Sequence, residues 1–326
     1  MPPAVRIVLE KRLASEPRGV AWSPQGFLAV AEHYKRVSIL DPGLEPVWAH
    51  SPGLYLTGAL AWSPRGRMLA VAARYGSLSP AGFTVYDVSE AAGARSLTAW
   101  LRRARRLRRV YTTGAVYSLA WSPDGGLLAA GSSIDRWIRV YRARRSGPEP
   151  AWEWSVQGLH RLLFTSRDHL YVYSLSWSPR GQRLAAAGGS GGEGFTALFT
   201  RGGVLQRLSR LSWTCFSVSW SPDESFIAVA CRDSLRVYDA ETGALVWRSP
   251  EGWYTNVAWL DQDTLAATTR TRLHVYTWIG LEAKPERTVE VAGFTEPGTG
   301  LSHHPGTGRL AVADTAGRRV VVLEPG

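Results

Sequence analysis

The apolar residues of this chain occur in short runs of about four to six, or alternate with polar residues, and turn-forming pairs separate the runs. This pattern is typical of β-strands joined in hairpins, because alternate side chains of a strand point to opposite faces. In the clearest stretch, strands are predicted over Val116–Trp121, Leu127–Ser132, Ile138–Arg142 and Ala151–Val156. The first two flank Ser122-Pro123-Asp124-Gly125, a turn in which proline sets φ and glycine tolerates a positive φ. The pattern predicts an all-β fold.

One segment recurs seven times along the chain. Its versions are AWSPQGFLAVA, AWSPRGRMLAVAA, AWSPDGGLLAAGS, SWSPRGQRLAAAG, SWSPDESFIAVAC, AWLDQDTLAATT and SHHPGTGRLAVAD. The corresponding anchor residues are Trp22, Trp62, Trp121, Trp177, Trp220, Trp259 and His303. Their spacings are 40, 59, 56, 43, 39 and 44 residues, so four lie near the ~40–45 residues expected of propeller blades and two contain insertions. Seven anchors predict seven blades.

The third unit, SLAWSPDGGLLAAGSSIDRWIRVYR, resembles the consensus of the WD-repeat family, and the resemblance covers essentially the whole chain. The VYD sequences at Val85–Asp87 and Val237–Asp239 stand where the family's Trp-Asp pair usually falls. The resemblance implies a seven-bladed β-propeller with four antiparallel strands in each blade. It also implies that residues 1–326 form a single domain.

Two polar features of that family can be compared with this chain. Asp135, Asp233 and Asp314 match the aspartate of the turn before the third strand, which in the family is a structural hydrogen-bonding residue. The family's Gly-His pair is absent from all units, and Thr113-Gly114 is its nearest relative. Without the His-Asp network, we expect the blades to rely more on packing and on the tryptophan anchors.

The two ends of the chain predict how the ring closes. After Arg319–Leu323 the seventh unit has three strands and lacks its outer one. Val5–Leu9 is a strand pattern without a unit of its own. Propellers of this family usually lend an N-terminal strand to the last blade, which also covers an exposed sheet edge. We therefore expect the N-terminal strand to complete blade seven.

Composition narrows the class of protein. With 326 residues and 45% hydrophobic content, the chain can bury a large core, which excludes global disorder. No apolar run approaches the ~18 residues of a membrane span and no signal-peptide pattern is present, so a cytoplasmic location is expected. Asparagine occurs once, at Asn256, and methionine and cysteine twice each. Scarcity of these thermolabile residues is compatible with a thermophile, although an excess of arginine over lysine can equally reflect genome composition.

The protein is basic, with a formal net charge of +11, and one segment carries much of the excess. If Ser96–Leu101 is the outer strand of blade two, the RRARRLRR sequence that follows falls in the loop before blade three. In the family such loops lie on the narrow top face. If this segment were helical, it would have a thin apolar stripe with arginines on both sides. A second insertion, 157–169, should emerge on the same face. The candidate partner-binding residues are Arg102, Arg103, Arg105, Arg106, Arg108, Arg109, Arg161, Phe164 and Arg167.

Catalysis, a cofactor and a metal are not predicted by any motif. His303-His304 stands at the anchor of blade seven without a third ligand beside it, so a variant anchor is favoured over a metal site. Gly188–Gly192 resembles a phosphate loop only in composition, because no Lys-Ser/Thr follows. We therefore expect a protein that is not an enzyme, and the sequence identifies no small-molecule substrate.

The two cysteines occupy related positions on neighbouring predicted strands. If Trp220 pairs with Phe226 across the intervening turn, antiparallel register places Cys215 opposite Cys231. Two buried free thiols are the favoured interpretation, because cross-strand bridges are strained and a shift of one residue in the register would separate the cysteines. A disulfide is the alternative, and it is admissible in the cytosol of a hyperthermophile.

Repeat proteins that lack a group of catalytic residues usually bind other macromolecules. The leading hypothesis is a non-catalytic scaffold whose rigid, partly basic top face holds a protein partner or an assembly. The alternative is a propeller that binds RNA or DNA through the arginine-rich insertion between blades two and three. A solvated surface loop is the third interpretation of that insertion, because runs of like charge are often only solvated.

Overall fold

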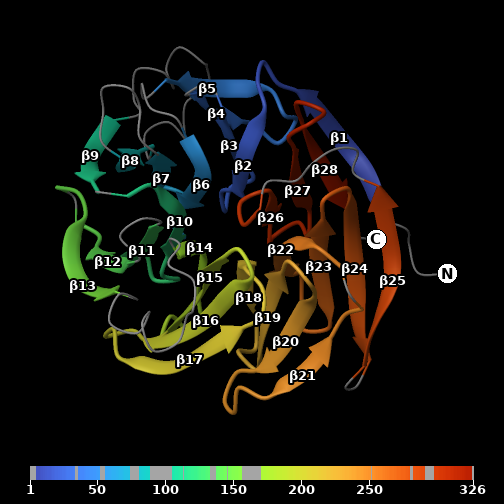
Figure 1. The fold of residues 1–326 in the computed structure, drawn as a ribbon. Helices are drawn as coiled ribbons and strands as arrows, with labels where there is room; N and C mark the ends of the chain where they lie inside the picture. The colour runs from blue at the N-terminus through green and yellow to red at the C-terminus, as the bar shows by residue number, and fades with distance from the viewer. Residues whose placement is uncertain are drawn as a thin grey trace.

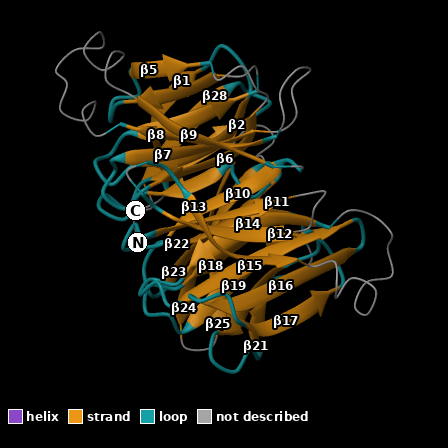
Figure 2. Cartoon of the chain, turned by 90° about the vertical axis from the view of Figure 1, so that its left-hand side faces the viewer, coloured by secondary structure: helices purple, strands orange, loops and turns teal. Residues whose placement is uncertain are grey.

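The computed structural model of the chain consists of β-strands and the loops that join them (Figure 2). It describes residues 5–33, 36–51, 56–73, 81–88, 105–112, 114–132, 137–144, 146–155, 170–250, 252–279, 282–290 and 297–324. Across these ranges there is no helix long and apolar enough to cross a membrane.

The strands form seven antiparallel sheets of four strands each, arranged as blades around a ring (Figure 1). Blade one contains β2 (Pro17–Trp22), β3 (Leu28–Glu32), β4 (Arg36–Leu40) and β5 (Pro46–His50). Blade two contains β6 (Leu56–Trp62), β7 (Met68–Ala73), β8 (Gly82–Asp87) and β9 (Arg105–Tyr111). Blade three contains β10 (Val116–Trp121), β11 (Leu127–Ser132), β12 (Trp137–Arg142) and β13 (Glu149–Ser155).

The remaining four blades repeat the same order of strands. Blade four contains β14 (Tyr171–Trp177), β15 (Arg183–Ser190), β16 (Glu193–Thr200) and β17 (Leu205–Leu211). Blade five contains β18 (Cys215–Trp220), β19 (Phe226–Cys231), β20 (Leu235–Asp239) and β21 (Leu245–Arg248). Blade six contains β22 (Tyr254–Trp259), β23 (Thr264–Thr269), β24 (Arg272–Ile279) and β25 (Glu282–Glu290). Blade seven contains β26 (Leu301–His303), β27 (Leu310–Asp314), β28 (Arg319–Glu324) and β1 (Arg6–Arg12).

The ring closes through blade seven, as the sequence predicts. β1 lies antiparallel to β28 and is the outermost strand of that sheet, so the two ends of the chain share one blade (Figure 1). Val5, just before β1, is buried with Leu310 and Leu323. The prediction that the N-terminal strand supplies the missing outer strand is therefore confirmed.

The core of the protein lies between the blades. One buried cluster joins Ile138 of blade three to Val172 and Phe195 of blade four. Another joins Ile39 of blade one to Val71 of blade two. Each sheet thus buries its faces against its neighbours, which explains why the second strands are apolar on both faces.

Strand direction defines two faces of the ring. The seven inner strands, which are the first strand of each blade, begin at one face, which we call the top face. Because neighbouring strands are antiparallel, the loops between second and third strands lie at this face, together with the connections into each following blade. The turns of the WSP segments lie at the opposite face.

The outer strand of blade two differs from the prediction. This position is occupied by β9, which starts at Arg105 and pairs with β8 so that Arg105 lies opposite Asp87 and Arg109 opposite Thr84. The assignment of Ser96–Leu101 as the outer strand is therefore wrong, and 105–111 forms a strand and not a helix or a top-face loop. An outer strand has a free edge, and charged residues there discourage pairing with other chains.

Candidate functional site

Four of the tryptophan anchors tie neighbouring blades together. The Nε1–H of Trp62, Trp121, Trp177 and Trp220 donates to the backbone carbonyl that precedes the anchor of the preceding blade, at 3.0–3.1 Å. The acceptors are Ala21, Ala61, Ala120 and Ser176. Because inner strands of different blades do not pair as sheets, these bonds fix one blade against the next. The loops of the top face therefore stand on a rigid frame.

Carboxylates at the top of the blades pair with arginine and replace the absent histidine network. Asp233 accepts bonds from Arg236 at 2.6 Å and Arg248 at 2.9 Å. Asp314 is fully buried and accepts from Arg319 at 2.7 Å. Both aspartates hold their turns, as the resemblance implies, whereas Asp135 lies outside the described residues.

Five inner strands contain a one-residue bulge, and in three of them the bulge residue is aromatic, whereas in β2 and β22 it is Arg18 and Thr255. The register shifts by one residue at Tyr117 in β10, at Tyr173 in β14 and at Phe216 in β18. The bulge residue is the fourth before the anchor in each case. Bulges commonly re-aim side chains next to functional sites.

These side chains form a continuous row, which we call the aromatic arc and define as Tyr117, Tyr171, Tyr173, Phe216 and Trp253. The ring centroids of Tyr117 and Tyr173 are 5.8 Å apart, and those of Tyr173 and Phe216 are 5.3 Å apart. Phe216 stacks on Trp253 at 6.3 Å. The arc follows the top ends of the inner strands from blade three to blade six. It borders the central cavity of about 180 Å³, which Tyr173 helps to line.

At the end of the arc, four top-face loops bring together alternating arginine and tryptophan side chains. The Arg232 guanidinium lies 5.3 Å from the ring centroid of Trp213 and 4.8 Å from that of Trp253. Arg270 covers Trp253 at 4.5 Å. Trp213 is 40% exposed, although indole rings are usually buried. We call these four residues the arginine–tryptophan cluster.

Three residues of the cluster, Trp213, Arg232 and Trp253, line an open pocket of about 320 Å³ together with Asp233 and Gly252. A backbone hydrogen bond joins the loop of Trp213 to the loop of Arg232, because the Arg232 N–H donates to the Thr214 carbonyl at 2.9 Å. The pocket combines aromatic surface with positive charge. It therefore suits a ligand with an anionic group and apolar neighbours.

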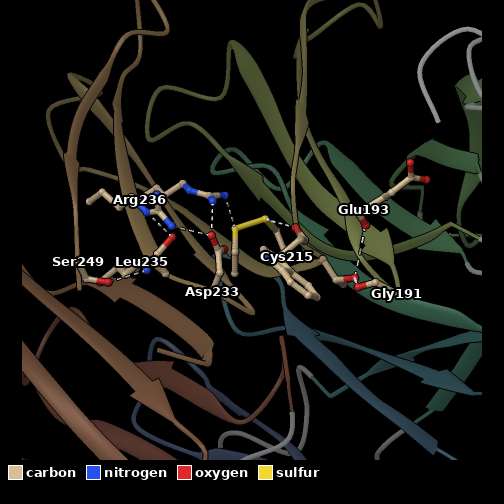
Figure 3. The surroundings of a disulfide bond; sticks show 12 residues. Gly191, Glu193, Cys215, Asp233, Leu235, Arg236 and Ser249 are labelled. Carbon is tan, nitrogen blue, oxygen red and sulfur yellow. Dashed lines mark hydrogen bonds and ion pairs between the residues drawn. A yellow bond between two sulfur atoms is a disulfide. The ribbon is translucent and has the colours of Figure 1, made fainter. Parts of the chain in front are cut away.

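A disulfide joins the strands beneath this pocket (Figure 3). Cys215, at the start of β18, lies opposite Cys231, at the end of β19, and their sulfur atoms are bonded. Arg236 extends toward the bond, with its guanidinium 3.5 Å from the Cys231 Sγ, and its other nitrogen binds Asp233 (Figure 3). The bond connects the strands that carry Trp213 and Arg232.

Of the residues predicted to bind a partner, four lie in the part of the chain that the structure describes. Arg105, Arg106, Arg108 and Arg109 belong to β9, on the rim of blade two, and the Arg109 Nε lies 3.4 Å from the Thr84 hydroxyl. β9 begins at the face opposite the top face, because β8 runs away from the top and β9 returns. Arg102, Arg103, Arg161, Phe164 and Arg167 lie outside the described residues.

His303 and His304 have the structural role of an anchor. His304 packs edge-on against Trp22, with ring centroids 5.6 Å apart, and its Nδ1 accepts the backbone N–H groups of Gly306 and Thr307 at 3.1 Å. It thus holds the turn as the WSP serines do elsewhere. Burial, and then His304, lower the pKa of His303. The described residues contain no group of three side chains able to hold a metal ion.

Sequence reasoning missed the aromatic arc and the arginine–tryptophan cluster. The aromatic residues at the fourth position before the anchors, Tyr117, Tyr173 and Phe216, are visible when the repeats are aligned. The cluster has no such signal, because Trp213, Arg232, Trp253 and Arg270 come from four different loops. Only the packing of blade five against blade six brings them together.

The geometry above is that of a seven-bladed β-propeller whose top face carries an aromatic and cationic surface. Three segments of the chain, residues 105–142, 160–192 and 207–239, match the family described as WD domain, G-beta repeat. Together with the seven four-stranded blades, these matches are consistent with a divergent WD-repeat propeller.

Two solved structures share this fold at low sequence identity. A chain of the Mitotic Checkpoint Complex is 15% identical, with a TM-score of 0.74, covering 99% of this chain and 91% of that one. The β-propeller domain of Cps50 (Swd1) from Myceliophteria thermophila is 16% identical, also with a TM-score of 0.74, covering 99% and 100%. At these identities the likeness shows the fold alone.

Proposed function

We propose that this protein is a non-catalytic scaffold that holds a protein partner on its top face. The observation that carries the proposal is the exposed Trp213 beside Arg232 at the end of the aromatic arc. Exposed tryptophan and arginine are the residues most enriched at the energetic centres of protein interfaces. One of the similar structures supports this use of the fold, since it is a chain of the Mitotic Checkpoint Complex.

The frame beneath the surface favours binding over catalysis. The tryptophan hydrogen bonds and the disulfide limit movement of the loops, so little conformational entropy is lost when a partner binds. We propose that the whole chain acts as one such platform, in the cytoplasm, and that its arginine–carboxylate pairs and disulfide serve an organism that grows at high temperature.

The scaffold proposal is tested by affinity capture from native lysate, with and without nuclease. The variant Trp213→Ser removes the exposed aromatic surface of the top face. Val204→Ser is the matched control, because Val204 is 65% exposed and lies in a loop of the opposite face. We expect the captured proteins to survive nuclease treatment, to be lost with Trp213→Ser and to remain with Val204→Ser. Equal capture by all three proteins would contradict the proposal.

A second candidate function is binding of RNA or DNA. The observation that favours it is the free outer edge of blade two, where β9 contributes Arg105, Arg106, Arg108 and Arg109 beside the further arginines that precede it in the sequence. Closely spaced arginines can neutralise successive phosphates of a nucleic acid. Loss of the captured partners after nuclease treatment would favour this candidate over the protein scaffold.

A further inference from the structure

Arg232 is held in an arrangement that leaves only one part of its side chain available to a ligand. Trp213 and Trp253 cover its guanidinium group, at 5.3 and 4.8 Å from their ring centroids. A guanidinium group stacked in this way still presents N–H donors in its plane. In the described part of the chain no carboxylate pairs with Arg232, and the residue is exposed.

The neighbouring charges leave the pocket positive. Asp233 also lines the pocket, but its carboxylate is already engaged by Arg236 and Arg248. Glu193, at the start of β16 in blade four, is engaged by Arg210 at 2.7 Å. A ligand carboxylate can therefore bind the parallel N–H groups at the edge of the Arg232 guanidinium, which we call the Arg232 fork. No unpaired carboxylate among the residues named here repels it strongly.

We propose that this pocket binds an acidic peptide segment, with an aspartate or glutamate carboxylate on the Arg232 fork and the flanking residues on Trp213 and the aromatic arc. A planar carboxylate matches the two parallel N–H groups of an arginine edge. A nucleic acid backbone needs several available cations in a track, whereas Arg236 and Arg248 already pair with Asp233. The inference rests on the scaffold proposal and names the chemistry of its partner.

The test is fluorescence polarisation with a labelled peptide in which glutamate alternates with serine, and with the same peptide carrying glutamine. We expect the acidic peptide to bind and the neutral one not to bind. Arg232→Gln should weaken binding about tenfold, which is the loss of one charge-assisted pair. Arg232→Lys keeps the charge but loses the fork, so it should weaken binding as well.

Arg180→Gln is the matched control, because Arg180 is an exposed arginine in a turn of the opposite face and its loss changes the net charge equally. Equal weakening by Arg180→Gln and Arg232→Gln would show general attraction to a basic protein and would overturn the inference. So would an RNA oligonucleotide that depends on Arg232 while the acidic peptide does not bind. Unchanged melting temperatures show that each variant is folded.

The two proposals can fail separately. Captured proteins that depend on Trp213 while the acidic peptide does not bind would leave the scaffold standing and remove the acidic peptide as its ligand. Peptide binding that depends on Arg232, without any captured partner that depends on Trp213, would support the pocket and contradict the scaffold proposal.

Discussion

Individual side chains in this propeller have separable tasks, and the tryptophans show the division. Four of the anchors donate to a carbonyl of the preceding blade, whereas Trp213 is exposed and Trp253 stacks on Phe216 and two arginines. Tryptophan therefore joins neighbouring blades at the anchor position, whereas in the top-face loops it provides aromatic surface. Position in the repeat distinguishes these roles.

The first prediction concerns the anchor hydrogen bond. Trp121→Phe removes the 3.1 Å bond to the Ala61 carbonyl and leaves that group without this donor. The free energy of unfolding should fall by about 1–3 kcal/mol. Trp213→Phe is the control, because an exposed substitution should change it by less than ~0.5 kcal/mol. Both values come from guanidinium unfolding curves, and equal losses would mean that the anchor bond contributes nothing.

The second prediction concerns acid. Burial, and then His304, lower the pKa of His303, while burial, and then Arg272, lower the pKa of His274. Below the unfolded value of 6.5 the unfolded chain binds protons that the folded chain does not, so stability falls as pH decreases below that value. The melting temperature should drop between pH 7 and pH 5. His303→Gln should show a smaller drop, and an identical pH profile in the variant would refute this assignment.

At the scale of elements, a single strand closes the ring and a single disulfide braces one blade. β1 pairs with β28 along its length and covers what would otherwise be an open edge of blade seven. The Cys215–Cys231 bond crosslinks two strands that already pair, at a sequence separation of 16. Each element can be removed without touching the others.

The third prediction concerns closure. Deleting residues 1–10 removes most of β1, which exposes the edge of β28 and the apolar surface around Val5. The melting temperature should fall by several degrees, and size-exclusion chromatography should show association through the open edge. Arg6→Gln is the control, since it breaks only the exposed ion pair with Glu324 and should have little effect. A deletion variant as stable as the full chain would disprove closure by this strand.

The fourth prediction concerns the disulfide. Thiol titration of the unfolded, unreduced protein should detect no free cysteine, and two after reduction. A closed loop of this length stabilises a protein by up to about 3 kcal/mol, so a reductant should lower the melting temperature. The double variant Cys215→Ala with Cys231→Ala should no longer respond to the reductant. Two free thiols before reduction would exclude the bond.

Some elements could be predicted residue by residue and others only in outline. The first two strands of blade three match their predicted bounds, and the WSP turn between them marks the end of the first and the start of the second. The sequence placed Cys215 opposite Cys231 through an inexact register, because Trp220 pairs with Ile227 and not with Phe226, and the bulge at Phe216 restores the opposition. The free thiols that the sequence favoured are wrong, since the two sulfur atoms are bonded. The outer strand of blade two was misplaced, because no turn signal follows the long insertion.

At the scale of the whole molecule, positive charge and aromatic surface lie in different places. The arginines of β9 lie on the rim of blade two, whereas the arginine–tryptophan cluster lies on the top face between blades five and six. The top face and the rim can therefore be tested separately.

The fifth prediction uses this separation. Binding of fluorescent RNA and duplex DNA is measured across a salt series for the native protein and for a variant with serine in place of the arginines between Arg102 and Arg109. The scaffold proposal predicts weak binding at physiological salt that the variant leaves unchanged. A steep negative salt slope that flattens in the variant would mean that this segment neutralises several phosphates, and would favour the nucleic-acid function.

The number of blades, the strand order within a blade and the closure by the N-terminal strand can all be derived from the sequence alone. Each of these follows from a local pattern that is repeated along the chain or missing from one end of it. Only the tertiary structure decided which side chains meet at the top face. Trp213, Arg232, Trp253 and Arg270 lie in separate loops, and their contacts depend on how far each inner strand bulges and how adjacent blades pack. The distances between side chains of different loops depend on how all seven blades close into a ring, and no single repeat encodes that closure.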